Sequence, residues 1–394
     1  MKEKTTLTFT GDIGFDHYMA EKWTDPELVS RDIMDVLHAS DHVIPNVEGP
    51  LIGKDDATLV TAAEMRLMHT IDPAAVGFLQ SLHGDIWNLC NNHIMDAGPE
   101  GLESTLKKAQ EAGVQTIGVG MEITEAARPV ILDEAGGIGL FAVGYQRGCK
   151  PAGPEKAGCL NWADFDTIQK TIDEIKAKCR WCILVSHGGE EFTSLPSPYT
   201  RDRYLKYLEM GVDIIVCHHP HVPMNYERVG EKIIFYSLGN FIFDTNYQRA
   251  QFNTEKGILL SLNLTPETWD FKAYGILIDR ETERVKSADL PLIFEDVQAE
   301  EYEKLAPLSA AAFVEATKKQ QIFLYPDQYR DADDKTWEEN FMNPRRSGRV
   351  EGEALDFQII CPFAETAKKG AWKDSSLENV KRYILDQLDE NSPG

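Results

Sequence analysis

The sequence predicts an α/β protein with a parallel core, later strands of a different kind and a helical C-terminal part. Short apolar runs alternate with stretches of helical periodicity over roughly the first 240 residues. From residue 232 onward, strand-like runs follow one another without helices between them. Alternating strands and helices are typical of parallel pairing. The later strands, joined by polar breaks, are expected to form either a second sheet or an antiparallel extension of the first.

Each element is predicted from its own pattern. The run TLTFTGD (6–12) is apolar and β-prone and ends in a polar turn, which is typical of a strand. The segment 99–113 has apolar residues at helical spacing, and Gly113 is placed to end it. By the same criteria, strands are expected at 6–12, 41–49, 85–93, 114–120, 181–187 and 212–219, and helices at 26–40, 72–82, 99–113, 163–179 and 200–211. Further strands are expected at 232–244, 256–265, 271–282 and 284–294.

The chain changes character after residue 296. From 297 to 394 it is charged and helical in pattern, with scattered aromatic residues and a loop-like segment, NPRRSGRVEGE. We therefore expect one domain over 1–296 and a mainly helical C-terminal extension over 297–394. The sequence assigns no role to the extension.

Composition argues against several classes of function. A net charge of −24 argues against nucleic acid as a partner, because phosphate binding requires clustered Lys and Arg. No stretch reaches the roughly 18 apolar residues of a membrane span, and the N-terminus lacks the apolar core of a signal peptide. A cytoplasmic location is therefore expected. The seven cysteines, Cys179 and Cys182 among them, are odd in number and irregularly spaced, so we expect reduced thiols.

Polar and ionisable residues follow the predicted strands at the point where each strand ends. They are Asp12, then Asn46 and Glu48, then Asn91, Asn92 and His93, then His187, and finally His219 and His221. Ligands of open α/β sheets bind beyond the carboxyl ends of the strands. Each of these residues, taken alone, also has a purely structural explanation, as a helix cap, a turn former or a packing group. Their joint occurrence at five strand ends favours one shared site.

These side chains form a recognisable donor set. Imidazole, carboxylate and amide oxygen together suit Zn, Mn or Fe(II). These residues offer more ligand atoms than a single tetrahedral ion needs. Two ions bridged by a carboxylate would use them all, and such a pair lowers the pKa of bound water and holds the attacking and leaving oxygens of a displacement. We therefore predict two divalent ions, Mn, Fe or Zn.

The motifs resemble those of a known family. FTGDI, NVEGPL, NLCNNHIMDAGPEGL, GVGMEITEAARPV, SHGGEEF, GVDIIVCHHPHVP and KIIFYSLGNFIFD follow one another over about residues 5–265. Their order and spacing are similar to those of the CapA-type proteins of poly-γ-glutamate capsule biosynthesis, a branch of the calcineurin-like metallophosphoesterase superfamily. The resemblance implies a four-layer αββα sandwich over 1–296, with the helical extension outside it.

The resemblance also implies roles for individual residues. It assigns metal ligation to Asp12, Glu48, Asn92, His187, His219 and His221. Glu48 takes the bridging position, and His93 is the general acid that protonates the leaving group. Positioning of substrate or water is assigned to Asn46, Glu191 and Asn240. His218 is expected to point away from the site.

Two departures from the superfamily pattern concern the first metal. Its first motif is Asp-x-His, whereas this chain has Gly14 two residues after Asp12, so one ligand is absent. Asp16 or His17 would substitute only if the loop folds back. The bridging Asp of the superfamily is here the longer Glu48. A mononuclear site is therefore the alternative to a dinuclear one.

The predicted function is that of a metal-dependent hydrolase acting on a phosphoester, or on a γ-glutamyl or other amide bond, of a small molecule or polymer. It would use a metal-activated water, with His93 as the acid. Two alternatives stay open. One is a metal-dependent peptide epimerase. The other is a non-catalytic accessory or polymer-binding protein in poly-γ-glutamate or capsule metabolism. The sequence does not specify the oligomeric state.

Overall fold

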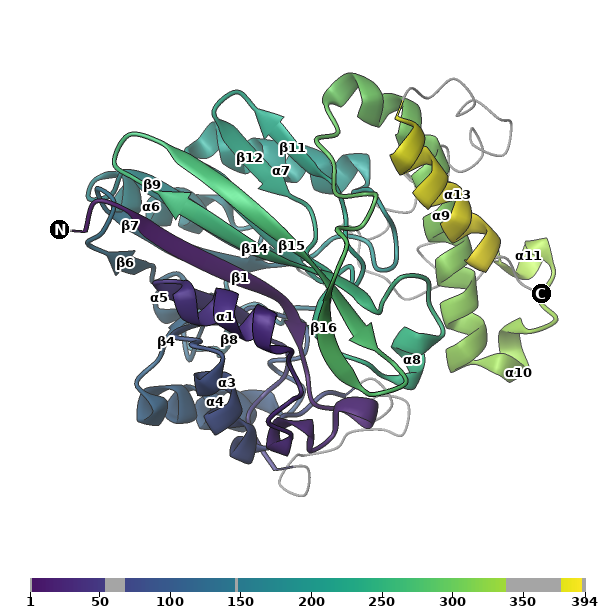
Figure 1. The fold of residues 1–394 in the computed structure, drawn as a ribbon, viewed down its shortest axis with the longest axis horizontal. Coiled ribbons are helices and arrows are strands. Elements are labelled where there is room, and N and C mark those ends of the chain that lie inside the picture. Colours follow the sequence, from purple (N-terminus) through teal and green to yellow (C-terminus); the bar gives the residue numbers. More distant parts are fainter. Residues whose placement is uncertain (1, 54–67, 146–147, 338–376, 392–394) are drawn as a thin grey trace.

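Two β-sheets stacked face to face form the centre of the protein in the computed structural model (Figure 1). The structure describes residues 2–53, 68–145, 148–337 and 377–391. Within these residues the first sheet has eight strands and the second has six. A separate two-stranded sheet consists of β5 (Val119–Gly120) and β8 (Gly158–Cys159).

The first sheet contains both the parallel core and the later strands. Its order is β16 (Arg284–Ala288), β15 (Trp269–Asp279), β14 (Lys256–Leu264), β1 (Thr5–Ile13), β2 (His42–Val47), β3 (Ile86–Asn88) and β4 (Gln115–Ile117), and β13 (Asn240–Ile242) also pairs with β1. Strands β1 to β4 are parallel to one another. Strands β14 to β16 are added antiparallel. Strands β14 to β16 therefore form an antiparallel extension of the first sheet. The strand predicted at 232–244 is divided between the two sheets, because β12 (Lys232–Phe235) belongs to the second sheet and β13 to the first.

The second sheet is parallel at its centre. Its order is β11 (Tyr226–Val229), β12 (Lys232–Phe235), β10 (Ile214–His218), β9 (Trp181–His187), β7 (Ile138–Gly144) and β6 (Val130–Leu132). β7, β9, β10 and β12 pair in parallel, and the two edge strands are antiparallel. Strand β7 is not among the predicted elements. It is buried along its whole length, so its apolar run lacks the alternation that marks a half-exposed strand.

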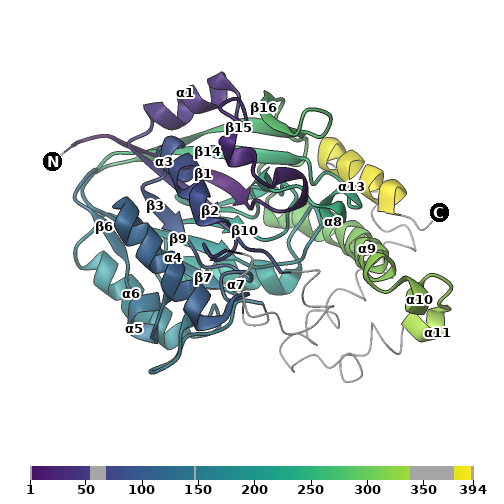
Figure 2. The same cartoon turned by 90° about the horizontal axis from the view of Figure 1, so that it is seen from below.

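Helices cover the outer face of each sheet and complete the four predicted layers (Figure 2). The first sheet carries α1 (Arg31–Ala39), α3 (Val76–Ser81) and α4 (Gly98–Ala112), and the second carries α5 (Ile123–Ala126), α6 (Phe165–Lys176) and α7 (Pro198–Met210). Right-handed crossovers between strands added in one direction place their helices on the same face. As predicted, α4 ends at Gly113, which adopts φ +72°.

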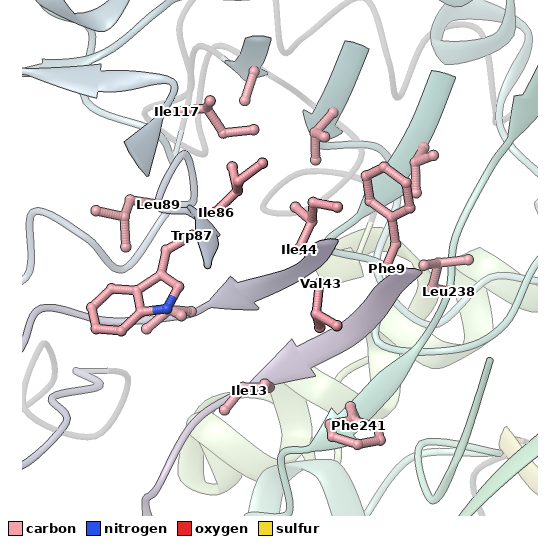
Figure 3. Packing of buried hydrophobic residues seen from close by; sticks show 14 of the residues in the cluster. Phe9, Ile13, Val43, Ile44, Ile86, Trp87, Leu89, Ile117, Leu238 and Phe241 are labelled. Atoms are coloured by element: carbon pink, nitrogen blue, oxygen red, sulfur yellow. The ribbon is translucent and has the colours of Figure 1, made fainter. Parts of the chain in front are cut away.

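Successive side chains along a strand of the second sheet point to opposite faces, and so they belong to two different apolar clusters. In β7, Leu140 and Ala142 join the cluster between the sheets, whereas Phe141 and Val143 pack with residues of α6 and α7. Figure 3 shows the inner cluster where the strands of the first sheet meet it. Truncating a large buried ring such as Phe9 typically costs about 3–5 kcal/mol. This core fixes the distance between the two sheets and hence between their strand ends.

After β16 the described chain is helical. It forms α9 (Ala299–Leu324), α10 (Pro326–Tyr329), α11 (Asp334–Trp337) and α13 (Glu378–Asn391). In Figures 1 and 2, α13 lies along α9 at one end of the sheets. The domain boundary at 296/297 remains a prediction, and the segment NPRRSGRVEGE lies outside the described residues. None of the helices that the structure describes is long and apolar enough to cross a membrane.

Short elements complete the described chain. They are the 3-10 helices η1 (His17–Met19), η2 (Lys22–Thr24) and η4 (Pro73–Ala75), and the short helix α8 (Asn246–Arg249). The helix predicted at 26–40 begins only at Arg31, because Val29 pairs with Val285 of β16 and is therefore extended. Cys179 and Cys182 are buried free thiols, as predicted.

Candidate metal centre

Four polar residues stand side by side in the first sheet. In register, Asp12 pairs with Asn240 on one side and with Asn46 on the other, and Asn46 pairs with Asn88. All four side chains are buried. Because the strands are parallel, residues in register meet at the same edge of the sheet. The row joins three predicted site residues and adds Asn88, which was not predicted.

Hydrogen bonds run along this row. The Asn88 amide donates to Asn46 Oδ1 at 2.7 Å, and the Asn46 amide donates to Asp12 Oδ1, also at 2.7 Å. The Asn46 side chain is fully buried and uses its oxygen for Asn88. It therefore positions the Asp12 carboxylate, whereas the prediction gave it a substrate-positioning role.

The second sheet brings histidines to the same edge. Strand β9 ends at His187 and β10 at His218, and the two are paired in register. The chain then turns through His219 and His221, whose φ angles are +101° and +58°. Non-glycine residues in this left-handed region are strained, and the surrounding structure must hold them there. Both rings are buried.

Glu48 lies at the centre of the imidazoles. Its Oε1 atom is 3.8 Å from His187 Nε2, 3.8 Å from His221 Nε2 and 4.0 Å from His93 Nε2. The side chain is fully buried, and Oε1 accepts no hydrogen bond from the residues that the structure describes. An unpaired buried carboxylate is costly. A cation among these donors would remove that cost.

Asp12 lies on the other side of His221. The Oδ2 atom of Asp12 is 3.1 Å from His221 Nδ1, but that nitrogen hydrogen-bonds with Asn240 Oδ1 at 3.0 Å. Within the described chain, Asp12 Oδ2 therefore accepts no hydrogen bond. His218 does not point away from the site, because its Nδ1 lies 3.3 Å from Asp12 Oδ1 in the buried interior.

The donors gather in two groups that fit a divalent ion. One contains Asp12, Glu48 and His221, and the other contains Glu191, His219 and His221, with the ligand atoms of each group within 4.8 Å of one another. Donors that share one ion at about 2.0–2.2 Å can be at most about 4.4 Å apart. The two groups approach that spacing, and their nitrogen and oxygen donors suit Zn, Mn or Fe(II). His221 belongs to both groups.

The remaining predicted ligands, His187 and Asn92, contact each other. His187 Nε2 hydrogen-bonds Asn92 Oδ1 at 2.7 Å and lies 3.8 Å from Glu48 Oε1. Asn240 lies beside His221 and anchors it, while its own amide donates to Gln248 at 3.1 Å. Asn240 therefore contacts a candidate ligand, and its predicted role in positioning substrate stays a prediction.

Burial shifts the titratable groups of the centre. It raises the pKa of Glu48 well above its usual range, and the charge of Asp12 adds to this effect. It lowers the pKa of His187 well below its usual range and that of His219 to about 4. Neutral imidazole is the form that binds a metal ion. Burial would lower the pKa of His221 as well, but Glu48 and Asp12 outweigh it and raise that pKa to about 10. A metal ion bound at His221 would therefore have to displace the proton that the two carboxylates hold there.

His93, the predicted general acid, is oriented by Asp96. Its Nδ1 atom lies 2.7 Å from Asp96 Oδ2, so the Nδ1 proton is donated to the carboxylate. The Nε2 atom then faces the centre, where it accepts a hydrogen bond from Asn92 Nδ2 at 2.9 Å and lies 4.0 Å from Glu48 Oε1. This leaves Nε2 as the nitrogen that can exchange a proton with a substrate.

A second histidine, His69, packs against His93. The two rings meet edge to face with centroids 4.2 Å apart. The His69 backbone N–H donates to Asp96 Oδ2 at 2.9 Å, and its Nδ1 lies 2.9 Å from Asp16 Oδ2. Two imidazole–carboxylate pairs therefore stand next to each other. Asp96 has a signal in the sequence, three residues after His93, whereas nothing near His69 indicates its place.

An aromatic ring takes the place of the absent histidine of the first motif. A Cβ atom on Gly14 would lie 2.6 Å from the Phe243 ring, so that ring fills the space beside Gly14. Phe243 also stacks on His221, with centroids 5.0 Å apart and planes inclined by 24°. Asp16 is engaged with another histidine, and His17 is exposed. Neither belongs to the ligand groups found among the described residues.

Comparison with known proteins places this site in a family. The family model described as "Bacterial capsule synthesis protein PGA_cap" matches residues 6–245, which contain every candidate ligand. The chain belongs to the PGA_cap family. The predicted resemblance is thereby confirmed.

Two relatives show how far the similarity of this PGA_cap protein extends. It is 28% identical to "Capsule biosynthesis protein CapA" of Bacillus anthracis over 257 residues, 63% of this chain and 62% of that one. It is 27% identical to "PGA biosynthesis protein CapA" of Bacillus subtilis (strain 168) over 251 residues, 62% of this chain and 65% of that one. The match thus spans less than two thirds of either relative.

The backbone of this PGA_cap protein is also weakly similar to a solved structure, that of TT1561 from Thermus thermophilus. The TM-score is 0.37 and the sequence identity 10%, over 68% of this chain and 98% of that one.

Proposed function

We propose that this PGA_cap protein is a metal-dependent hydrolase whose reaction takes place at the edge shared by the two sheets. The observation that carries the proposal is the environment of Glu48 Oε1, a buried carboxylate oxygen with three imidazole nitrogens within 4.0 Å and no donor in the described chain. A buried carboxyl without a partner takes up a proton, in keeping with the raised pKa of Glu48, or binds a cation in place of that proton. Asp12 Oδ2, which lies 3.1 Å from His221 Nδ1, likewise accepts no hydrogen bond from the described residues.

The residues that would hold the metal are the two groups joined by His221, with His187 and Asn92 beside Glu48. Divalent ions in such a site lower the pKa of a coordinated water and polarise the electrophile. The chain's own contribution is geometric. Asn46 and Asn240 fix the orientation of Asp12 and His221, so the donors are held before any ligand arrives.

Proton transfer is assigned to His93. Asp96 holds its Nδ1 proton, and the proton on Nε2 can pass to the leaving group as the bond to the electrophile breaks. The attacking water supplies a proton in the same cycle, which returns Nε2 to its starting state. Asp96 stabilises the imidazolium that precedes the transfer, and the ring is a neutral imidazole until the proton of the water returns to Nε2.

The substrate class is proposed from the family. The two relatives are named for capsule and PGA biosynthesis, which supports a γ-glutamyl amide bond of a glutamate polymer as the bond cleaved. A phosphoester is the second substrate, because the same donors would serve a phosphoryl displacement.

A direct test combines metal analysis with two substrates. The purified protein is expected to retain divalent metal and to cleave a γ-glutamyl oligopeptide or an aryl phosphate. His93→Ala should abolish turnover while the metal content stays unchanged. Protein that binds no Mn, Fe or Zn would overturn the proposal.

A second candidate is an accessory protein that binds the polymer without cleaving it. Both relatives are named for biosynthesis, and a polymer-binding role in assembly fits those names as well as a cleaving one does. It predicts metal-loaded protein that binds oligo-γ-glutamate but leaves its length unchanged over long incubation. Chromatography of the incubated polymer separates the two candidates.

A further inference from the structure

Glu191 connects the candidate metal centre to the C-terminal helices. Its Oε1 atom lies 3.8 Å from His219 Nε2, within the second ligand group. Its Oε2 atom accepts hydrogen bonds from Gln320 Nε2 of α9 at 2.8 Å and from the Tyr247 hydroxyl at 3.4 Å. One carboxylate therefore has one oxygen toward the imidazoles and the other held by α9.

The loop after Glu191 is held by the same helices. Every residue of 192–196 is hydrogen-bonded, through its backbone or side chain, to a side chain of α9 or α13. Three side chains supply these contacts: Tyr302 and Ser309 of α9, and Gln387 of α13. The Tyr302 hydroxyl donates to the carbonyl at position 196 at 2.7 Å, and the Ser309 hydroxyl accepts from the N–H at position 195 at 3.1 Å. The C-terminal helices thus fix the course of this loop.

Helix α9 also supports a ring that touches a candidate ligand. Phe192 packs against Ala316 of α9, and its ring stacks on His221 with centroids 6.0 Å apart and planes inclined by 24°. Phe192 adopts φ +59°, a strained conformation for a phenylalanine. The contacts from α9 and α13 offset that strain and keep Glu191 turned toward the histidines.

Glu191 differs in exposure from the other carboxylates of the centre. Its side chain is 27% exposed, whereas those of Asp12 and Glu48 are 0% exposed. A partly exposed glutamate keeps rotamer freedom unless it is bonded, and ordering it costs free energy on binding. The hydrogen bond from Gln320 removes part of that freedom beforehand.

We propose that Gln320 is a positioning residue for the metal centre, and that the α9–α13 pair completes the ligand group formed by Glu191, His219 and His221. This inference rests on the metal centre proposed above and gives the C-terminal helices a role in it. Partners that orient metal ligands typically change metal affinity by about 10–100-fold when they are removed.

The test is a Co(II) titration of the full chain, followed by absorption spectroscopy. The variants are Gln320→Ala and Gln320→Met, the second of which keeps the bulk of the side chain without its hydrogen-bond donor. Gln321→Ala is the matched control, because it removes the same side chain one position along α9 and hence on another face. Thermal unfolding in chelator records the stability of each variant without metal.

Both Gln320 variants are expected to bind Co(II) about tenfold more weakly and to change its visible spectrum, with Gln321→Ala like wild type. Unchanged Co(II) affinity and spectrum in Gln320→Met would overturn this inference alone, because wild-type binding would still support the centre. A Gln320 variant that is less stable without metal but binds Co(II) with wild-type affinity would also overturn this inference alone. Wild-type protein that binds no Co(II) would instead overturn the centre itself.

Discussion

The Nδ1 atom of His93 and the Oδ2 atom of Asp96 lie 2.7 Å apart, and this contact decides which nitrogen of His93 faces the centre. Replacing Asp96 by Asn leaves the shape intact but removes the acceptor that fixes the ring and its charge. We expect Asp96→Asn to lower kcat of the proposed hydrolysis by about 10–100-fold, with metal content unchanged.

Steady-state kinetics and metal analysis check this prediction together. Asp166→Asn, at an exposed position on α6, is the matched control and should behave as wild type. Equal kcat for Asp96→Asn and wild type would show that His93 does not depend on this carboxylate.

Gly14→His restores the histidine of the superfamily motif but should not restore a ligand. The new Cβ would lie 2.6 Å from the Phe243 ring, so the side chain cannot enter without displacing that ring. Overpacking of this kind costs about 1–3 kcal/mol. Urea unfolding should record the loss, with metal affinity no higher than in wild type.

The double variant Gly14→His/Phe243→Ala tests whether the Phe243 ring causes this loss of stability. Removing the ring opens the space beside Gly14, so part of the lost stability should return. If the single variant is as stable as wild type and binds metal more tightly, Phe243 does not block the position.

Metal removal should lower the stability of the protein. A ligand that binds only the folded state adds about 2.7 kcal/mol at a concentration of 100 Kd. Chelation should therefore lower Tm, and Mn(II) or Zn(II) should restore it. Glu48→Gln removes a buried carboxylate beside Asp12, so its metal-free Tm should be at least that of wild type, while its response to metal should disappear.

Differential scanning calorimetry with and without Mn(II) measures both effects. A Glu48→Gln variant that still gains the full wild-type increase in Tm on metal addition would exclude Glu48 as a ligand.

His42 should make stability depend on pH, away from the metal centre. Its Nδ1 lies 2.6 Å from Asp85 and its Nε2 3.2 Å from Glu134. The Asp85 hydrogen bond outweighs burial and raises the pKa of His42 above its ordinary value of 6.5. The folded state thus holds this proton more tightly, so the contribution is full below about pH 6.5 and is lost as pH rises through the folded pKa.

Because both carboxylates are partly exposed, the effect should be at most about 1 kcal/mol. Urea unfolding at several pH values above 6 measures it. Asp85→Asn should flatten the dependence, and an equal slope in wild type and His42→Gln would contradict the assignment.

The sequence predicts the parts of the site that follow their own strand. Asp12 lies near the end of its own apolar strand, β1, so its place at the sheet edge follows from neighbouring residues. The same holds for His187 and for the loop of His219 and His221. Gly113, which ends α4, is local as well. These features depend on a few neighbouring residues, and periodicity detects them.

Features that depend on distant pairing could not be predicted. Asn88 becomes important only because β3 is in register with β2, which places it against Asn46. Phe243 fills the space beside Gly14 from 229 positions further along the chain. Gln320 reaches Glu191 across 129 positions. Such contacts are set by the stacking of sheets and helices, which single-segment patterns do not contain.

His221 is shared by the two ligand groups, and this sharing has a thermodynamic consequence. One imidazole cannot give the same nitrogen to two ions, so filling one group changes what the other can offer. Loading should therefore be anticooperative, with a tight first event and a weaker second one separated along the titration. The number of ions bound would then depend on the free concentration of metal around the protein.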